Sequence, residues 1–118
     1  MAMFVNFASY NMRGFGQGHF QLLEVCKGHD IIGIQEHWLP DCDLNKITSL
    51  HDEFVVVAKS AMSDKLQPGF LRGRPFGGLA LLFRKSVIAE CKLIGVATNC
   101  RCLAVMIRLH TGRHFLLM

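Results

Sequence analysis

The 118-residue sequence is poor in charged residues and in proline, and it has no apolar run long enough to cross a membrane. Charged side chains make up 19% of the chain and only three residues are proline. Disordered chains are usually rich in both, so we expect this chain to fold. Its longest apolar stretches, residues 78–83 and 103–107, have the length of strands, which excludes a membrane-spanning helix. Hydrophobic residues make up 51% of the sequence, enough to form a core.

The cysteines do not form the pattern of a disulfide framework. There are five, an odd number without even spacing, and no basic and apolar leader follows Met1. These features favour a reducing intracellular setting, in the nucleus or the cytoplasm, over secretion. The net charge of +4 and the isoelectric point near 9.0 permit an anionic partner without requiring one.

Hydrophobic periodicity predicts one α/β (α+β) domain, or part of one, that opens with a strand, a helix and a strand. Strands are expected over residues 3–10, 31–34, 54–58, 77–83, 87–94 and 102–109, with a turn at 110–114 leading into a final strand. Between them we expect a glycine-punctuated loop at 11–18, a helix at 19–27, a short helix at 43–50 and a long polar loop at 59–76. The last four residues are apolar, which indicates that part of the sheet is absent and the domain truncated.

Polar residues follow two of the expected strands directly. Asn11 ends the first strand, and Gln35 and Glu36 end the second. Ligand sites of sheets flanked by helices favour such carboxyl ends, and neighbouring strands would bring Asn11 and Glu36 together. A carboxylate beside a neutral amide suits Mg²⁺, which keeps several waters and substrate phosphate oxygens as ligands. The sequence therefore makes Glu36 a candidate metal ligand and Asn11 a candidate to place a phosphate or a metal-bound water.

Three segments resemble one protein family in the same order along the chain. They are residues 9–15 (SYNMRGF), residues 30–39 (DIIGIQEHWL) and residues 74–84 (RPFGGLALLFR). They resemble motifs of the endonuclease/exonuclease/phosphatase (DNase I-like) superfamily, and most closely those of the apurinic-type endonuclease domain of non-LTR (LINE-like) retrotransposons. The resemblance implies that residues 1–118 are the N-terminal half of a four-layer sandwich of two packed β-sheets with outer helices.

The same resemblance implies a metal-dependent hydrolase that nicks a target strand of DNA, with Mg²⁺ or Mn²⁺ as its cofactor. Only Asn11 and Glu36 carry over, both as catalytic and metal-site residues. The family's histidine–aspartate base, its further aspartate and asparagine, and its tyrosine would all lie beyond Met118. Without that base we expect the isolated chain to be a poor nuclease or none.

Other residues around these motifs are candidates for lesser roles. Arg13, Arg72 and Arg74 are candidate contacts to a DNA backbone, and the basic stretch extends to Lys65, Arg84 and Lys85, although a solvated face explains it equally well. Strand alternation predicts that His37 points away from Glu36 and has a hydrogen-bonding or stacking role. Trp38 is expected in the core more than on a base or sugar.

Three further patterns favour structural explanations. The glycines of residues 14–18 imitate a dinucleotide-binding fingerprint, but His19 stands where its third glycine belongs and the expected helix is only about two turns long. Cys100, Cys102, His110 and His114 are not spaced like a zinc site. The remaining cysteines, Cys26, Cys42 and Cys91, have no catalytic motif around them and are expected to be packing residues.

Two alternatives to a DNA endonuclease stay open. One is a related phosphoesterase that acts on a small phosphate. Such an enzyme would share the asparagine and glutamate but lack the sequence of residues 74–78. The other is a non-catalytic remnant that binds DNA or a protein partner, which would show salt-sensitive binding without cleavage. The sequence does not indicate an oligomeric state.

Overall fold

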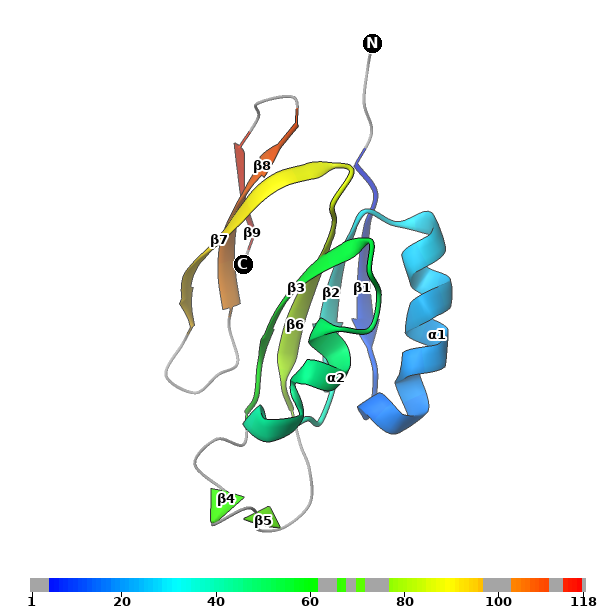
Figure 1. Ribbon diagram of the computed structural model, residues 1–118, viewed down its shortest axis with the longest axis vertical. Helices are drawn as coiled ribbons and strands as arrows, with labels where there is room; N and C mark the ends of the chain where they lie inside the picture. The colour runs from blue at the N-terminus through cyan, green and yellow to red at the C-terminus, as the bar shows by residue number, and fades with distance from the viewer. Residues whose placement is uncertain are drawn as a thin grey trace.

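A computed structural model describes residues 5–61, 66–67, 70–71, 77–96, 103–110 and 114–117 (Figure 1). Within these ranges the chain is a mixed α/β structure of two packed sheets, with a separate pair of short strands. The fold class expected from the sequence is confirmed in this respect. Residues 1–4 of the first expected strand lie outside the described ranges.

The first sheet contains four strands in the order β1-β2-β6-β3. They are β1 (Phe7–Asn11), β2 (Ile31–Gln35), β6 (Leu79–Arg84) and β3 (Phe54–Lys59). β1 and β2 pair in parallel because a helix crosses between them, and β6 is antiparallel to both β2 and β3. The opening strand, helix and strand predicted from the sequence are therefore confirmed, and β1 and β2 are neighbours.

The helix α1 (Phe15–Gly28) is longer than the sequence predicted. It has 14 residues and begins at Phe15, so the expected loop at 11–18 and the expected helix start at His19 were wrong. The reason is Gly18, which is buried in the helix, where an added Cβ would lie 2.6 Å from the carbonyl oxygen of Met12. That glycine lets the helix pack closely against the chain leaving β1, whereas the sequence pattern indicated a turn.

Several other elements differ from expectation in their number or in their ends. A 3-10 helix, η1 (Asp41–Asp43), and α2 (Asn45–Thr48) replace the single short helix expected at 43–50. The expected long loop contains a small antiparallel pair, β4 (Leu66–Gln67) and β5 (Phe70–Leu71). β6 begins two residues later than expected because Gly77 and Gly78 have positive φ angles of 61° and 98°, which are not strand conformations.

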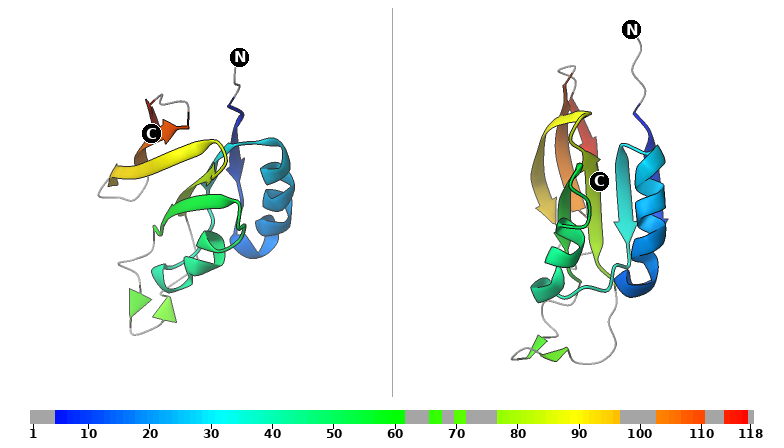
Figure 2. Two further views of the ribbon diagram at one scale, coloured as in Figure 1. Left: turned by 45° about the horizontal axis from the view of Figure 1, so that its top comes forward. Right: turned by 45° about the vertical axis from the view of Figure 1, so that its right-hand side comes forward.

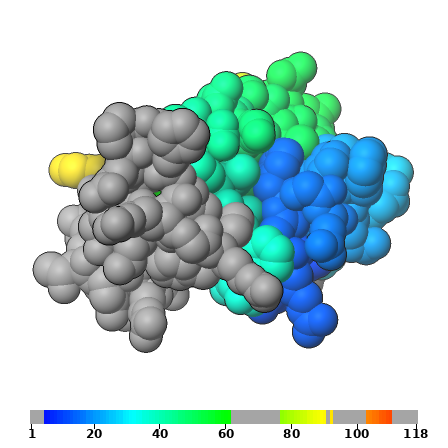
Figure 3. Space-filling view, turned by 90° about the horizontal axis from the view of Figure 1, so that it is seen from below, coloured from blue at the N-terminus to red at the C-terminus, as the bar shows by residue number. Residues whose placement is uncertain are grey.

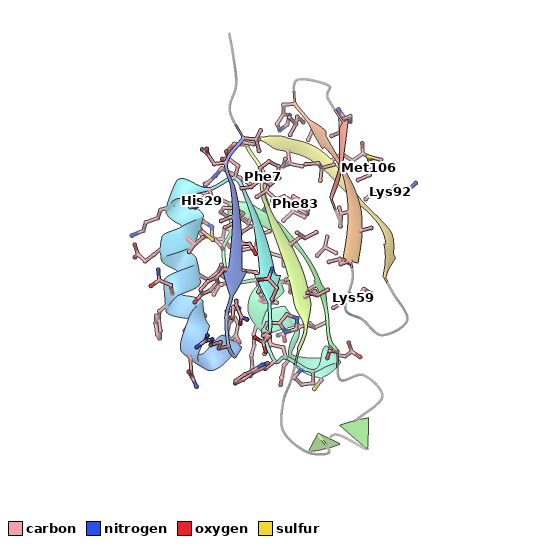
Figure 4. The ribbon with its side chains drawn as sticks, turned by 180° about the vertical axis from the view of Figure 1, so that it is seen from behind. Phe7, His29, Lys59, Phe83, Lys92 and Met106 are labelled. Atoms are coloured by element: carbon pink, nitrogen blue, oxygen red, sulfur yellow. The ribbon has the colours of Figure 1, made fainter. Side chains whose placement is uncertain are left out.

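The second sheet contains β7 (Ile88–Val96), β8 (Leu103–Leu109) and β9 (His114–Leu117), all antiparallel. Alternate residues of β8 are buried, as expected for a strand with one face on a core. They pack against Ile31 and Phe83 of the first sheet. Figure 2 shows the two sheets facing each other, and Figure 4 labels Phe83 between them.

The opposite face of the first sheet packs against the helices. Leu22 and Cys26 of α1 and Ile47 of α2 form one buried cluster with Ile32 and Leu82 of the sheet. The described residues thus supply three layers of the expected four-layer sandwich: helices, first sheet and second sheet. No helix among them is long and apolar enough to span a membrane.

Candidate functional site

The carboxyl ends of β1 and β2 lie side by side at one end of the first sheet. Asn11 pairs with Gln35 in the parallel register. The Met12 N–H donates to the Gln35 carbonyl and the Gly14 N–H donates to the Glu36 carbonyl, each at 2.9 Å. The segments that follow β1 and β2 are therefore joined by main-chain hydrogen bonds. Figure 3 looks onto this end, where the blue and cyan segments lie against each other.

Asn11 is exposed at the end of β1, where its side chain organises the next loop. Its Oδ1 accepts a hydrogen bond of 3.1 Å from the main-chain N–H of Arg13. Arg13 has a φ angle of 51°, in the left-handed region, and its side chain is exposed. The sequence placed both residues beside the expected site, and the structure brings them to the same end of the sheet as Glu36.

Glu36 does not continue strand β2. Its φ angle is 57°, a left-handed conformation that few residues other than glycine adopt. Its N–H donates to the Gly78 carbonyl at 2.9 Å, just before β6 begins. The main chain of Glu36 is thus held between the loop after β1 and the loop before β6, and its side chain is only partly buried.

Backbone conformations with positive φ gather at this end of the sheet. Among the described residues, all six belong to the three loops that meet here: Arg13, Gly14, Glu36, Trp38, Gly77 and Gly78. Non-glycine residues in this region are strained by about 1–2 kcal/mol each, and such strain collects at functional sites. The strained backbone therefore lies at the same end of the sheet as Asn11 and Glu36.

His37 is fully buried beside Glu36. Its Nε2 donates to the Lys59 carbonyl at 2.9 Å, and its Nδ1 accepts from the Leu39 N–H at 2.9 Å. The hydrogen-bonding role expected from the sequence is confirmed. The expectation rested on strand alternation, but β2 ends at Gln35, so the left-handed turn at Glu36 sets the direction of His37 instead.

The environment of His37 predicts a pH dependence of folding. Burial lowers its pKa below the ordinary value of 6.5, while main-chain hydrogen bonding at Lys59 and Leu79 opposes the shift. The unfolded chain therefore takes up a proton before the folded chain does. The stability is complete above the unfolded pKa and is lost as the pH falls through the folded pKa.

We expect the free energy of unfolding to decrease from pH 7.5 to pH 5.5, with a His37 contribution of at most about 1.4 kcal/mol per pH unit. Urea unfolding of the wild-type chain and of His37→Gln at several pH values measures this contribution. The variant should show a shallower decrease over that range. Parallel curves for the two proteins would contradict the prediction.

Trp38 lies over the loop after β1, at the border of the core rather than within it. An added Cβ on Gly14 would lie 2.8 Å from Cζ3 of the Trp38 ring. The Trp38 N–H donates to the Gly77 carbonyl at 2.9 Å. The roles of Gly14 and Gly78 at this end were missed, because the sequence pattern indicated only that glycines were present in loops.

Of the basic residues expected around the long loop, only some belong to the described ranges. Arg72, Arg74 and Lys65 lie outside the described residues. Arg84 lies at the far end of β6, paired with Asp30 (Nε to Oδ1, 3.3 Å) and Glu53 (Nη1 to Oε2, 3.2 Å). Its expected place in a basic face around the long loop was therefore wrong, because its guanidinium binds main-chain and acidic groups of the fold.

The cysteines are described only in part. Cys26 and Cys42 are free thiols, and burial raises the pKa of Cys26 against the opposing charge of Arg84, so its reactive thiolate is disfavoured. Cys100 and Cys102, which were considered above as zinc ligands, lie outside the described residues. The length of α1 removes one argument against a dinucleotide site, but His19 still occupies the position of the third glycine.

The donor set at this end fits a hard cation with few protein ligands. Within the described ranges there is no group of three or more histidine, cysteine, aspartate or glutamate side chains that could enclose a metal. Asn11 at the end of β1 supplies an amide, and Glu36 directly after the neighbouring β2 supplies a carboxylate. Mg²⁺ is usually held by one or two carboxylates, with waters and substrate phosphates as the other ligands, so the residues present fit it.

Three solved structures of similar fold are named as an endonuclease, a phosphatase and a catalytic domain. AP endonuclease LMAP from Leishmania major has a TM-score of 0.60 at 12% identity, over 95% of this chain and 38% of that one. The 3' phosphatase NExo from Neisseria, bound to a product DNA hairpin, has a TM-score of 0.55 at 13% identity, over 98% and 40%. The human Nocturnin catalytic domain with bound sulfate has a TM-score of 0.55 at 17% identity, over 95% and 47%.

No family profile matches the chain, and no curated protein matches it significantly. The likeness to the three structures is one of fold, because the identities are only 12–17%. The chain spans between 38% and 47% of the length of those proteins. Over that span, the chain has the DNase I-like fold of these structures.

Proposed function

We propose that residues 1–118 are the metal- and phosphate-binding part of a Mg²⁺- or Mn²⁺-dependent DNA endonuclease domain of the non-LTR retrotransposon type. The observation that carries the proposal is the meeting of three distant segments. The N–H groups of Gly14 and Phe15 donate to the carbonyls of Glu36 and His37, and those of Glu36 and Trp38 donate to Gly78 and Gly77. These residues belong to the three segments whose sequences resemble motifs of that family.

Glu36 and Asn11 have distinct roles in the proposed site. Glu36 would hold the metal through its partly exposed carboxylate. Asn11 would direct its amide N–H at a phosphate oxygen, because its Oδ1 already accepts the Arg13 N–H. The exposed Arg13 side chain would contact the DNA backbone. A bound divalent metal supplies charge neutralisation on the scissile phosphate and its leaving oxygen.

The proposal predicts that Mg²⁺ strengthens DNA binding through Glu36. With a short duplex, we expect the wild-type chain to bind on the order of tenfold more tightly in Mg²⁺ than in chelator, a difference of about 1.4 kcal/mol. Glu36→Gln should lose this metal dependence, since a neutral amide holds Mg²⁺ poorly. Fluorescence anisotropy measures both affinities.

The ratio of the two affinities is the informative quantity, because removing any carboxylate also reduces repulsion of DNA. Glu24→Gln is the matched control: it makes the same change on the exposed face of α1, where Glu24 pairs with Lys27. That variant should keep the wild-type ratio. Equal ratios for Glu36→Gln and the wild type would contradict the proposal, and binding without any metal effect would favour the non-catalytic remnant.

A phosphoesterase acting on a smaller phosphate is the second candidate, because a related fold belongs to a 3' phosphatase. Competition separates the two. Under the endonuclease proposal, unlabelled duplex displaces the labelled duplex far better than inorganic phosphate at equal phosphate concentration. In supercoiled-plasmid assays with Mg²⁺, we expect little or no nicking by this chain alone, because the resemblance places the general base beyond Met118.

A further inference from the structure

We infer that His37 is the positioning residue of this site, whose buried ring holds Glu36 in its left-handed conformation. The inference deepens the proposed function and rests on it only for the identity of what Glu36 binds. It concerns a side chain that contacts neither substrate nor metal, since both ring nitrogens are hydrogen-bonded within the protein and none of the residue is exposed.

The hydrogen bonds assign the tautomer of the His37 ring. Nδ1 accepts the Leu39 N–H, so it carries no proton. Nε2 therefore carries the proton and donates it to the Lys59 carbonyl. The ring thereby ties the last residue of β3 to the chain just beyond Glu36. Figure 4 labels Lys59 at that end of β3.

The ring also packs directly against Gly78, the glycine whose carbonyl accepts the hydrogen bond from Glu36. An added Cβ on Gly78 would lie 2.6 Å from both ring nitrogens, so a side chain there would overlap the ring. The Gly78 carbonyl accepts the Glu36 N–H at 2.9 Å. His37 thus fixes both the position of the Gly78 carbonyl, just before β6, and the path of the chain after Glu36.

This support is what a left-handed glutamate requires. Such a conformation persists only where the surrounding structure determines it. Glu36 at φ 57° and Trp38 at φ 59° lie on either side of His37, and both main-chain N–H groups bond to the Gly77–Gly78 loop. Without the ring, Glu36 and Trp38 can relax to ordinary negative φ, and the Glu36 carboxylate then moves away from the end of the sheet where Asn11 lies.

Three variants of the 118-residue chain separate the contributions of the ring. His37→Gln keeps a donor near Lys59, His37→Asn keeps an acceptor near the Leu39 N–H, and His37→Phe keeps only the ring. The matched control is Val105→Ala, which removes buried packing in the second sheet, away from the site. Glu36→Gln defines the loss of the metal ligand.

Two readouts by nuclear magnetic resonance decide the inference. The first is the Mn²⁺ concentration needed to broaden the Asn11 amide signal, and the second is hydrogen exchange of the Glu36 and Trp38 amides. We expect His37→Phe to weaken Mn²⁺ binding by about tenfold or more, the usual effect of removing a residue that orients a metal ligand. Both amides should exchange faster, Gln and Asn should give intermediate values, and Val105→Ala should change neither readout.

Wild-type exchange rates and Mn²⁺ affinity in His37→Phe would overturn the inference. So would equal losses in Val105→Ala, because His37 would then act only through general stability. If the wild-type chain binds no Mn²⁺ at Glu36, the proposed function fails, and amide exchange alone judges His37: faster exchange at Glu36 and Trp38 in His37→Phe supports its positioning role, and unchanged exchange refutes it.

Discussion

Replacing Gly78 with alanine is expected to lower the free energy of unfolding by about 3 kcal/mol, since overpacking costs about 1–3 kcal/mol and a non-glycine left-handed residue about 1–2. Both effects apply at this position. Gly78 has a φ angle of 98°, and an added Cβ would overlap the buried His37 ring. Equilibrium unfolding in urea measures the loss.

Gly16→Ala is the matched control for this substitution. Gly16 lies in the first turn of α1, and an added Cβ there meets nothing within 4 Å. Alanine should therefore stabilise the helix by up to about 1 kcal/mol. Combining Gly78→Ala with His37→Ala removes the overlapping ring, so the double variant should lose less stability than the sum of the single changes. A neutral Gly78→Ala, or additive effects, would contradict the packing described.

Replacing Arg84 with methionine is expected to destabilise the chain by about 3 kcal/mol, in the range found when one partner of a buried ion pair is removed. The Arg84 side chain is 19% exposed and pairs with Asp30 and Glu53. It also donates to the carbonyls of Cys26 and His29 at the end of α1, and its Cζ lies 4.6 Å from the centre of the Phe54 ring. One side chain thus joins α1 to the starts of β2 and β3.

Arg108→Met provides the comparison for Arg84. Arg108 is 42% exposed and pairs with Glu90 through its Nε at 3.2 Å. Exposed pairs contribute about 0–1 kcal/mol, so the two arginines should differ clearly in urea unfolding. Arg84→Lys should recover only part of the loss, because an ammonium group cannot reproduce the planar fork of a guanidinium. Similar losses at Arg84 and Arg108 would contradict a structural role for Arg84.

The strands were predictable because the hydrophobic pattern of each sequence matches the burial of that strand in the fold. β2, β3 and β6 are runs of apolar and β-branched residues that are covered on both faces over most of their length, and β8 alternates regularly. The parallel pairing of β1 and β2 follows from the helix between them. The meeting of Asn11 and Glu36 was inferred on that basis.

The residues whose roles were predicted wrongly or for the wrong reason depend on tertiary contacts, which the local sequence does not show. Gly18 looks like a turn residue, yet it serves close packing against Met12 inside a helix. Arg84 looks like a surface cation, and only the fold brings Asp30 and Glu53 to it. The position of the His37 ring depends on the left-handed turn at Glu36. Such turns are usually predicted from a glycine, and this one is formed by a glutamate.

The central claim is that the loops after β1 and β2 form one metal site, and the location of bound Mn²⁺ tests it most directly. Nuclear magnetic resonance spectra of the 118-residue chain with small amounts of Mn²⁺, which takes oxygen ligands as Mg²⁺ does, show which amides lie near the ion. The account predicts selective broadening at Asn11, Arg13 and Glu36, abolished in Glu36→Gln and retained in Glu24→Gln. Broadening centred on other residues, or unchanged in Glu36→Gln, would contradict it.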